Sequence, residues 1–396
     1  MKLAIVRQKY TPFGGAERFV ERALAALRDK GVDVSIIARA WQDAAGGMPG
    51  VRVNPFYLGR TWRDAGFARA VQRLIAERRF DLVQSHERIP GCDIYRAGDG
   101  VHATWLDLRN KPLDRLAPWH RFTVAAEAEM FRHPALRAVI CNSRMVRDDI
   151  ARRFGIPDDK LQVIYNGVDL QAFHPRLREE QGQALRQKIF GETQSAAVGR
   201  IGNSAAPVIL FVGSGYQRKG LPTLLHALSR MARRDARLWV VGRDKQESLM
   251  RSLAQTLGVD ERVMFLGAQT DVRPFYGTAD VFALPTLYDP FPNAALEALA
   301  CGLPLVTTTT CGAAELVTEA NGVVIAAGDV AALALNLDLL CAKAPVMRDA
   351  ARASVAHLDQ AQMAGQLMAL YSRLLAAALP YRPHAVKFPV SPARTR

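Results

Sequence analysis

The sequence predicts an α/β protein with two parallel-sheet domains that face each other across a cleft. Short apolar segments alternate with helical patterns in both halves of the chain, and the alternation breaks between about residues 170 and 206. Strands that alternate with helices form parallel sheets. A chain of 396 residues is also longer than one hydrophobic core usually supports.

The first half begins with a strand over residues 3–6, a glycine loop and a helical pattern over residues 16–28. Gly31 follows as a C-cap and residues 32–38 form the next strand, which completes a βαβ unit. Ser143 is expected to cap a helix that ends at Gly155. Further elements are expected as a helix over residues 67–75 and strands over 82–83, 94–95, 139–141 and 163–165.

The alternation restarts at Val208, with apolar strands that each end at a turn residue. We therefore expect an N-terminal domain over residues 1–175, a linker with one short helix over 176–206 and a second domain over 207–359. The last helix, about 360–379, is expected to pack back on the first domain. Residues 381–396 carry only positive charge and three prolines, which predicts a disordered tail that could bind a surface.

The formal net charge of +14 favours anionic partners, although an arginine-rich proteome would give the same balance. Five scattered cysteines fit reduced, buried thiols. The first apolar run has only four residues, and no segment approaches the roughly 20 apolar residues of a membrane span. We expect a cytoplasmic protein, or one peripheral on a membrane. The histidines and cysteines show no metal spacing, so neither a metal nor another cofactor is expected.

Two glycine-containing loops follow predicted strands. Gly14-Gly15 lets backbone N–H groups approach an anion, although a tight turn would need the same residues. The loop Gly213–Gly220 fails both the dinucleotide and the P-loop patterns, but it places Arg218 and Lys219 at a strand end before a helix. This pair suits a diphosphate; two solvated surface cations are the alternative.

The stretch YDPFPNAALEALACGLPLV holds two carboxylates in an almost uncharged run. Asp289 lies in a loop beyond a strand, and Asn293 is expected to cap a helix that contains Ala294 and Glu297. Carboxylates accept hydrogen bonds from sugar hydroxyls, whereas the helix N-terminus suits phosphate. A general acid/base pair, or a first-turn helix dipole residue at Glu297, are the alternatives.

Of the histidines near strand ends, His102 is better placed than His86, because neighbouring glycines allow a ligand to approach. Residues 101–130 mix aromatic and cationic side chains, as a membrane headgroup surface does, although a helical pair packed on the domain would have the same composition. The residues expected on that surface are Trp105, Arg109, Lys111, Arg115, Trp119 and Arg121.

These motifs, taken together, resemble those of the retaining GT-B glycosyltransferases of family 4, with two Rossmann-like domains. Within the family, the sequence is most similar to enzymes that add the first glucose to inner-core heptose of lipopolysaccharide. The matching stretches run almost from end to end: KYTPFGGAER, PGCDIY, VIYNGVDLQAF, VGSGYQRKG, VVGRDK, the carboxylate stretch above and TTTTCGAAELV.

The resemblance implies roles for several residues. Gly14 and Gly15 would face donor phosphate and acceptor, Arg218 and Lys219 would hold the diphosphate, and His102 would be a cleft histidine. Glu297 would bind the ribose, and Asp289 would touch the transferred sugar. The family usually has Glu where this chain has Asp289, and Pro292-Asn293 replaces small residues, so the chain departs from the pattern at the donor sugar.

The expected activity is therefore transfer of a hexose, with retention, from a UDP-linked sugar to a hydroxyl of the lipopolysaccharide core or of another lipid-linked glycan. As in the family, no metal is implied, and the enzyme would be peripheral on the anionic inner face of the cytoplasmic membrane. An epimerase or sugar phosphorylase of similar build is the rival enzyme. A basic nucleic-acid-binding protein is the rival binding module, but the sequence holds no nucleic-acid-binding motif.

Overall fold

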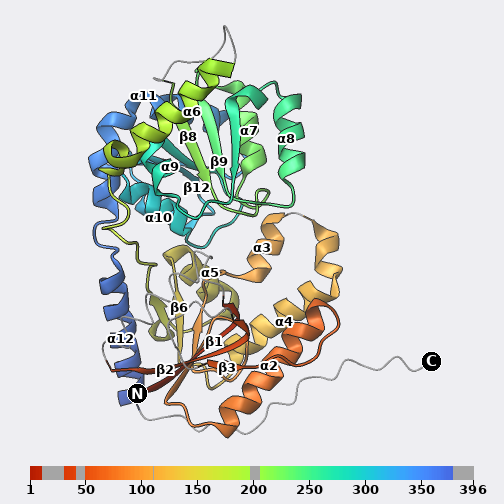
Figure 1. Cartoon of the computed structure of the whole chain (residues 1–396). Helices are drawn as coiled ribbons and strands as arrows, with labels where there is room; N and C mark the ends of the chain where they lie inside the picture. Colours follow the sequence, from red (N-terminus) through yellow and green to blue (C-terminus); the bar gives the residue numbers. More distant parts are fainter. Residues whose placement is uncertain (11–30, 42–49, 110, 197–205, 378–396) are drawn as a thin grey trace, which may run out of the picture.

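The computed structural model describes residues 1–10, 31–41, 50–109, 111–196 and 206–377 as two α/β domains stacked along one axis (Figure 1). Gly14 and Gly15, the helix expected over residues 16–28 and the tail 381–396 lie outside the described residues.

The N-terminal domain is built on a parallel sheet with the strand order β3-β2-β1-β4-β5-β6-β7. Its strands are β1 Lys2–Tyr10, β2 Asp33–Trp41, β3 Gly50–Arg52, β4 Leu82–Ser85, β5 Ile94–Arg96, β6 Ala138–Cys141 and β7 Leu161–Val163. Its described helices are α2 Gly59–Glu77, α3 His102–Arg109, η1 Pro112–Leu116, α4 Pro118–Arg132, α5 Arg144–Phe154 and η2 Asp158–Lys160. The edge strand β3 was not predicted from the sequence, and the last strand begins two residues earlier than expected.

The C-terminal domain repeats the architecture with the order β10-β9-β8-β11-β12-β13. Its strands are β8 Val208–Val212, β9 Arg237–Val241, β10 Val263–Gly267, β11 Val281–Leu284, β12 Leu305–Thr308 and β13 Gly322–Ile325. Its helices are α7 Leu221–Arg230, α8 Glu247–Thr256, η4 Asp260–Arg262, α9 Arg273–Thr278, α10 Asn293–Ala300, η5 Gly312–Leu316 and α11 Val330–Ser354.

Both sheets reverse their strand order at the first strand of the domain. In the N-terminal sheet β1 lies between β2 and β4, and in the C-terminal sheet β8 lies between β9 and β11. Ligands of open parallel sheets bind beyond the strand ends at such reversal points. A ligand is therefore expected to bind at the loops after β1, β4, β8 and β11.

The described part of the predicted linker, residues 176–196, is helical over most of its length. A π-helix, η3 Arg178–Gly182, continues directly into α6 Gln183–Ala196. Arg178 and Arg186 both form ion pairs with Asp280, just before β11. The arginines that make the segment look solvated thus fix it to the C-terminal domain.

The final helix, α12 Gln360–Ala376, crosses from the C-terminal domain and lies along the N-terminal sheet (Figure 1). Leu367, Leu370 and Tyr371 belong to the same buried cluster as Leu3 in β1. The hydroxyl of Tyr371 also donates a 2.7 Å hydrogen bond to Gln84 Oε1, with both residues buried. Helix α12 therefore completes the core of the N-terminal domain.

Helix α11 is the one helix among the described ranges whose length and apolar composition would also suit a membrane span. Its Leu333, Leu337 and Ala344 are buried in the main core cluster of the C-terminal domain. These residues form the buried side of the helix, whereas Leu335, Leu339 and Val346 on the same helix are exposed.

Candidate active site

The loop after β8 is held in place by short contacts that leave little freedom. Asp244 Oδ2 accepts a 2.7 Å hydrogen bond from the backbone N–H of Gly215. Gly220 ends the loop at φ +79°, and a Cβ there would lie 1.8 Å from the carbonyl oxygen of Pro285. Only glycine fits this approach, so the loop packs closely against the segment that follows β11.

Arg218, Lys219 and Asp289 form one charged cluster at this junction. Arg218 Nη1 lies 3.1 Å, and Lys219 Nζ 3.0 Å, from Asp289 Oδ2. Burial alone would raise the pKa of Asp289, but the charges of Lys219 and Arg218 and their hydrogen bonds hold this pKa below its usual range. The cations predicted for the donor diphosphate and the acid predicted for its sugar thus lie in direct contact.

Helix α10 holds the remaining predicted donor ligands. Glu297 Oε2 accepts a 2.8 Å hydrogen bond from the hydroxyl of Tyr276, which also contacts the carbonyl oxygen of Ala294. The prediction that Asn293 caps the helix is wrong: Pro292 is the N-cap, and Asn293 is already helical. Its Oδ1 instead accepts a 2.7 Å hydrogen bond from Asn166 of the N-terminal domain.

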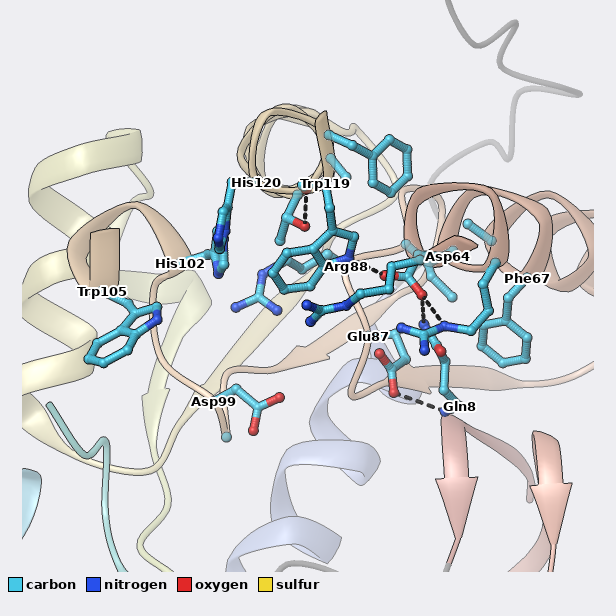
Figure 2. A pocket seen from close by; sticks show the side chains of 18 of the residues that line it. Gln8, Asp64, Phe67, Glu87, Arg88, Asp99, His102, Trp105, Trp119 and His120 are labelled. Carbon is cyan, nitrogen blue, oxygen red and sulfur yellow. Dashed lines mark hydrogen bonds and ion pairs between the residues drawn. The ribbon is translucent and has the colours of Figure 1, made fainter. Parts of the chain in front are cut away.

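A cavity of about 770 Å³ lies between the domains, and the N-terminal domain forms most of its wall (Figure 2). From the C-terminal domain it is lined by Arg218, Tyr288, Asp289 and Pro290. Lys219, Asn293, Ala294 and Glu297 do not line it. The charged cluster therefore contributes Arg218 and Asp289 to the cavity wall, while Lys219 contacts Asp289 without lining this cavity.

His102 faces the cavity together with a second histidine, His120 from α4 (Figure 2). His102 Nε2 lies 2.9 Å from His120 Nδ1, and the two rings stack. Burial, reinforced by Arg88, His120, Arg60 and Arg109, lowers the pKa of His102 from 6.5 to about 3. At neutral pH His102 is therefore uncharged, and one ring of the pair donates a hydrogen bond to the other.

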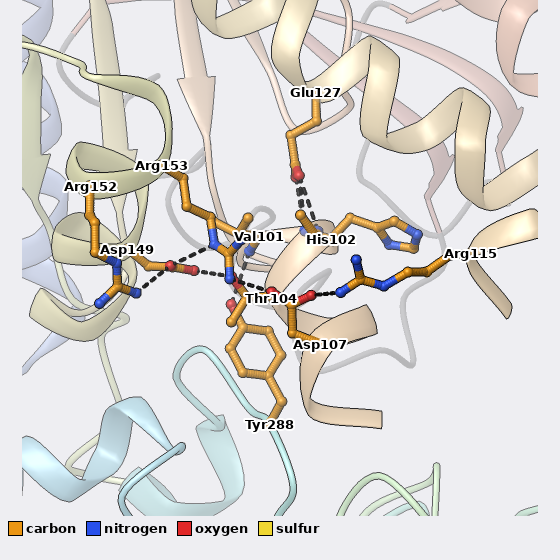
Figure 3. A network of polar contacts seen from close by, with 11 residues as sticks. Val101, His102, Thr104, Asp107, Arg115, Glu127, Asp149, Arg152, Arg153 and Tyr288 are labelled. Carbon is orange, nitrogen blue, oxygen red and sulfur yellow. Dashed lines mark hydrogen bonds and ion pairs between the residues drawn. The ribbon is translucent and has the colours of Figure 1, made fainter. Parts of the chain in front are cut away.

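Glu127 supports His102 from behind (Figure 3). This carboxylate is fully buried, and it accepts hydrogen bonds of 3.0 and 3.1 Å from the backbone N–H of His102 at the start of α3. It also forms a 2.8 Å ion pair with Arg88. The backbone position of His102 is thus set by a buried, charge-assisted network.

Tyr288 reaches from the C-terminal domain to the same corner of the N-terminal domain (Figure 3). Its hydroxyl accepts a 2.9 Å hydrogen bond from the backbone N–H of Val101. A Cβ on Gly100, which has φ +67°, would lie 2.1 Å from that hydroxyl. Glycine at this position allows the two walls of the cavity to meet.

Beside the histidine pair, Asp64, Trp119 and Arg60 form a platform, with the Trp119 ring centred 5.2 Å from that of His102. The indole Nε1–H of Trp119 donates a 2.7 Å hydrogen bond to Asp64 Oδ2, and Asp64 also pairs with Arg63 at 2.8 Å. The guanidinium carbon of Arg60 lies 3.8 Å from the centre of the Trp119 ring. Burial would raise the pKa of Asp64, but hydrogen bonds from Arg63, Trp119 and Gln8 lower it.

The six residues predicted to form one membrane-facing surface divide into two groups. Trp105, Arg109 and Trp119 line the cavity, whereas Lys111, Arg115 and Arg121 are exposed. The first three lie on the cavity wall because α3 and α4 turn one face of each helix towards the cavity. The exposed leucines Leu113 and Leu116 lie beside the outward group on η1.

Sequence reasoning missed His120, Asp64, Glu127 and Tyr288. The stretch containing His120 and Glu127 was noted for its mixed aromatic and charged composition, but helical spacing alone does not show which face points inward. Asp64 lies in the helix that was expected to begin only at residue 67.

Two parallel-sheet domains with a cavity between them form the GT-B fold. The model for Glycosyltransferase Family 4 matches residues 13–172, and the model for Glycosyl transferases group 1 matches residues 206–343. The chain therefore belongs to the group 1, family 4 glycosyltransferases, which use a nucleotide-sugar donor and are typically retaining and metal-independent.

Similar proteins include enzymes of lipopolysaccharide synthesis. The chain is 27% identical to the lipopolysaccharide glucosyltransferase WaaG of Escherichia coli K12, over 82% of this chain and 85% of WaaG. It is 34% identical to the lipopolysaccharide core glycosyltransferase LpsE of Rhizobium meliloti, over 35% of this chain and 40% of LpsE.

Solved structures match the fold over nearly the whole chain. A WaaG crystal structure superposes with a TM-score of 0.78 at 24% identity, covering 93% of this chain and 99% of that one. Anabaena HepE in complex with UDP and glucose superposes with a TM-score of 0.71 at 20% identity, covering 94% and 100%.

Proposed function

We propose that this protein transfers a hexose from a UDP-linked sugar to a hydroxyl of the lipopolysaccharide core or of a related lipid-linked glycan, with retention of configuration. The observation that carries the proposal is the charged cluster of Arg218, Lys219 and Asp289, which opens onto a cavity walled by the neutral His102. The similarity to WaaG and LpsE supports the acceptor class, and the UDP complex of HepE supports the donor.

On the donor side, Arg218 and Lys219 would stabilise the negative charge that grows on the departing diphosphate. In the structure this charge is supplied by Asp289, so the cations are already held in place before the donor arrives. Preorganised charge of this kind is usually the largest contribution to catalysis. Glu297, oriented by Tyr276, would bind the ribose hydroxyls.

On the acceptor side, His102 would hydrogen-bond a sugar hydroxyl at the reacting centre. Because its imidazole is neutral, it can accept or donate a hydrogen bond without placing a positive charge beside the forming oxocarbenium-like centre. The acceptor hydroxyl would attack on the face from which the diphosphate leaves, and a departing phosphate oxygen would take its proton.

The decisive experiment has two parts. Calorimetry with UDP and UDP-sugars should show binding by the wild-type protein, and mass spectrometry of glycolipids should show one hexose missing in cells that lack it. No heat with any uridine or guanosine diphosphate conjugate would overturn the proposal. A new nucleotide-sugar formed without any acceptor would instead indicate an epimerase. Release of sugar 1-phosphate would indicate a phosphorylase.

We also propose that the enzyme works on the anionic inner face of the cytoplasmic membrane. Exposed Leu113 and Leu116, 77% and 68% accessible, lie close in sequence to the exposed cations Lys111 and Arg115. Apolar side chains flanked by cations suit a headgroup region. Sedimentation with vesicles that contain anionic lipid should fall for Leu113→Ser/Leu116→Ser, and equal sedimentation with neutral and anionic vesicles would contradict the proposal.

A further inference from the structure

We propose that the acceptor carries an oxyanionic substituent, a phosphate or a carboxylate, which binds to Lys9 and Arg60 on the N-terminal wall of the cavity. This inference rests on the proposed function and narrows the chemical class of its acceptor. It concerns the half of the cavity that lies opposite the donor cluster.

The cavity is lined by more cations than carboxylates. The cationic lining residues among the described ranges are Arg7, Lys9, Arg60, Arg63, Arg88, Arg109 and Arg218, and the carboxylates are Asp64, Glu87, Asp99 and Asp289. A neutral sugar would leave those lining cations that have no carboxylate partner uncompensated when it displaces water from the cavity. Burying charge without a partner is costly, so the lining favours a negatively charged ligand.

Most of the other lining cations already have carboxylate partners. Arg63 pairs with Asp64, Arg109 with Asp114 and Arg218 with Asp289. Arg88 likewise pairs with the buried Glu127.

Lys9 and Arg60 differ from these paired cations. No carboxylate in the described part of the chain pairs with either residue, and both side chains are solvent-exposed. They are therefore the cations of the cavity with charge to offer a ligand.

Arg60 is held ready for such a ligand. Its guanidinium lies over the face of Trp119, and the indole is anchored by its 2.7 Å hydrogen bond to Asp64. Stacking on an aromatic ring leaves the N–H groups of a guanidinium available, and their fork geometry matches the oxygens of a phosphate or carboxylate. Because the Arg60 side chain is already ordered, it loses less conformational entropy on binding a ligand than an unsupported surface arginine would.

Lys9 and the acidic lining residues complete a site for a charged sugar. Lys9 lies at the C-terminal end of β1, the edge of the sheet where ligands of parallel sheets bind. Glu87 and Asp99 line the same cavity and can accept hydrogen bonds from sugar hydroxyls. The donor diphosphate has its own cations on the opposite wall, so the two anion sites are separate.

The test uses the full chain with UDP at saturation, so that the donor site is occupied. Glucose 6-phosphate, glucuronate and glucose are titrated as probes at one ionic strength. We expect at least one of the charged probes to bind about 10-fold tighter than glucose, the gain of one charge-assisted contact. The tighter of the two identifies the substituent as a phosphate or a carboxylate.

The variant Lys9→Gln/Arg60→Gln should lose this preference while still binding UDP. Arg121→Gln on the exposed side of α4 is the matched control and should keep the preference. If the double variant does not fold, UDP binding will be lost as well, and Lys9→Gln alone then serves as the test. Glucose binding as tightly as both charged probes, or a preference that survives in the folded variants, would overturn the inference. UDP binding by the wild type reports separately on the proposed function.

Discussion

The two walls of the cavity are built in different ways. The C-terminal wall consists of short loops directly after β8 and β11, backed by a single large core cluster. The N-terminal wall comes largely from α2 and from the helical segment α3-η1-α4 (Figure 1), which is inserted in the sequence between β5 and β6. Three smaller core clusters support that domain. The cations of the first wall share a buried carboxylate, whereas Lys9 and Arg60 of the second do not.

This difference shows how one fold can keep its donor and change its acceptor. A strand-end loop has few ways to present a cation, and its contacts here leave little space for variation. An inserted helical segment can change its length and its lining without disturbing the sheet. We therefore expect substitutions in the C-terminal wall to act on the rate of transfer, and those in the N-terminal wall to act on acceptor choice.

The largest effect is expected for Lys219→Ala. Loss of a preorganised cation beside the leaving diphosphate should lower kcat by about 10²–10³-fold while changing acceptor KM only slightly. Steady-state kinetics with varied acceptor measures both constants. Lys343→Ala, an exposed lysine on α11, is the control. Wild-type turnover in Lys219→Ala would refute the assigned role.

The contact between the walls can be tested with Gly100→Ala. Gly100 and Gly258 have almost the same backbone conformation, φ +67° and +65°, but only at Gly100 would a Cβ meet another residue, Tyr288. Both substitutions should cost about 1–2 kcal/mol of stability from the left-handed backbone. Gly100→Ala alone should also lower kcat/KM by about 10- to 100-fold, because the walls are displaced. Equal activity of the two variants would show that this contact does not set the cavity.

The buried His102 predicts a pH dependence of stability. Its pKa is about 3 in the folded protein and 6.5 ordinarily, so between these values the unfolded chain binds more protons. The free energy of unfolding should therefore fall as pH drops from about 6.5 towards 3, by at most about 1.4 kcal/mol per pH unit from this group. Urea unfolding across this range should show a shallower fall for His102→Gln.

The smallest effect is expected for Tyr371→Phe in α12. It removes the hydrogen bond to buried Gln84 and leaves that amide oxygen without its partner, at a cost of about 1–2 kcal/mol. Activity should be unchanged, because α12 lies on the N-terminal sheet away from the cavity lining. Chemical unfolding and a transfer assay measure the two quantities, and a rate loss larger than the stability loss would contradict this separation.

The fold was largely predictable because buried parallel strands are short apolar runs, such as VILFV of β8, that end at turn residues. Ser143 Oγ accepts a hydrogen bond from Val146 N and Gly155 adopts the left-handed conformation, which confirms both predicted caps of α5. The polar segment that contains Arg178 and Arg186 was predicted as a linker, because composition does not reveal the ion pairs that these arginines form with Asp280, about a hundred residues later in the chain.

The candidate site was predictable only where chemistry followed a strand directly. Arg218 and Lys219 come from the loop after β8 and Asp289 from the loop after the neighbouring strand β11, so their meeting follows from topology. The pair of His102 and His120 depends on which faces of α3 and α4 point inward, and the contact of Trp119 with Asp64 joins two helices whose residues are 55 positions apart in the sequence. Such contacts arise from tertiary packing and leave no local pattern.

The return of α12 to the first domain has a consequence for biosynthesis. The apolar surface of β1 and its neighbours is finished only by residues near the end of the chain. While the ribosome synthesises the C-terminal domain, this apolar surface of the N-terminal domain stays exposed to solvent. Exposed apolar surface of this kind promotes aggregation. Chaperone capture should therefore persist until release of the last helix, and a message truncated before codon 360 should yield a product that needs constant protection.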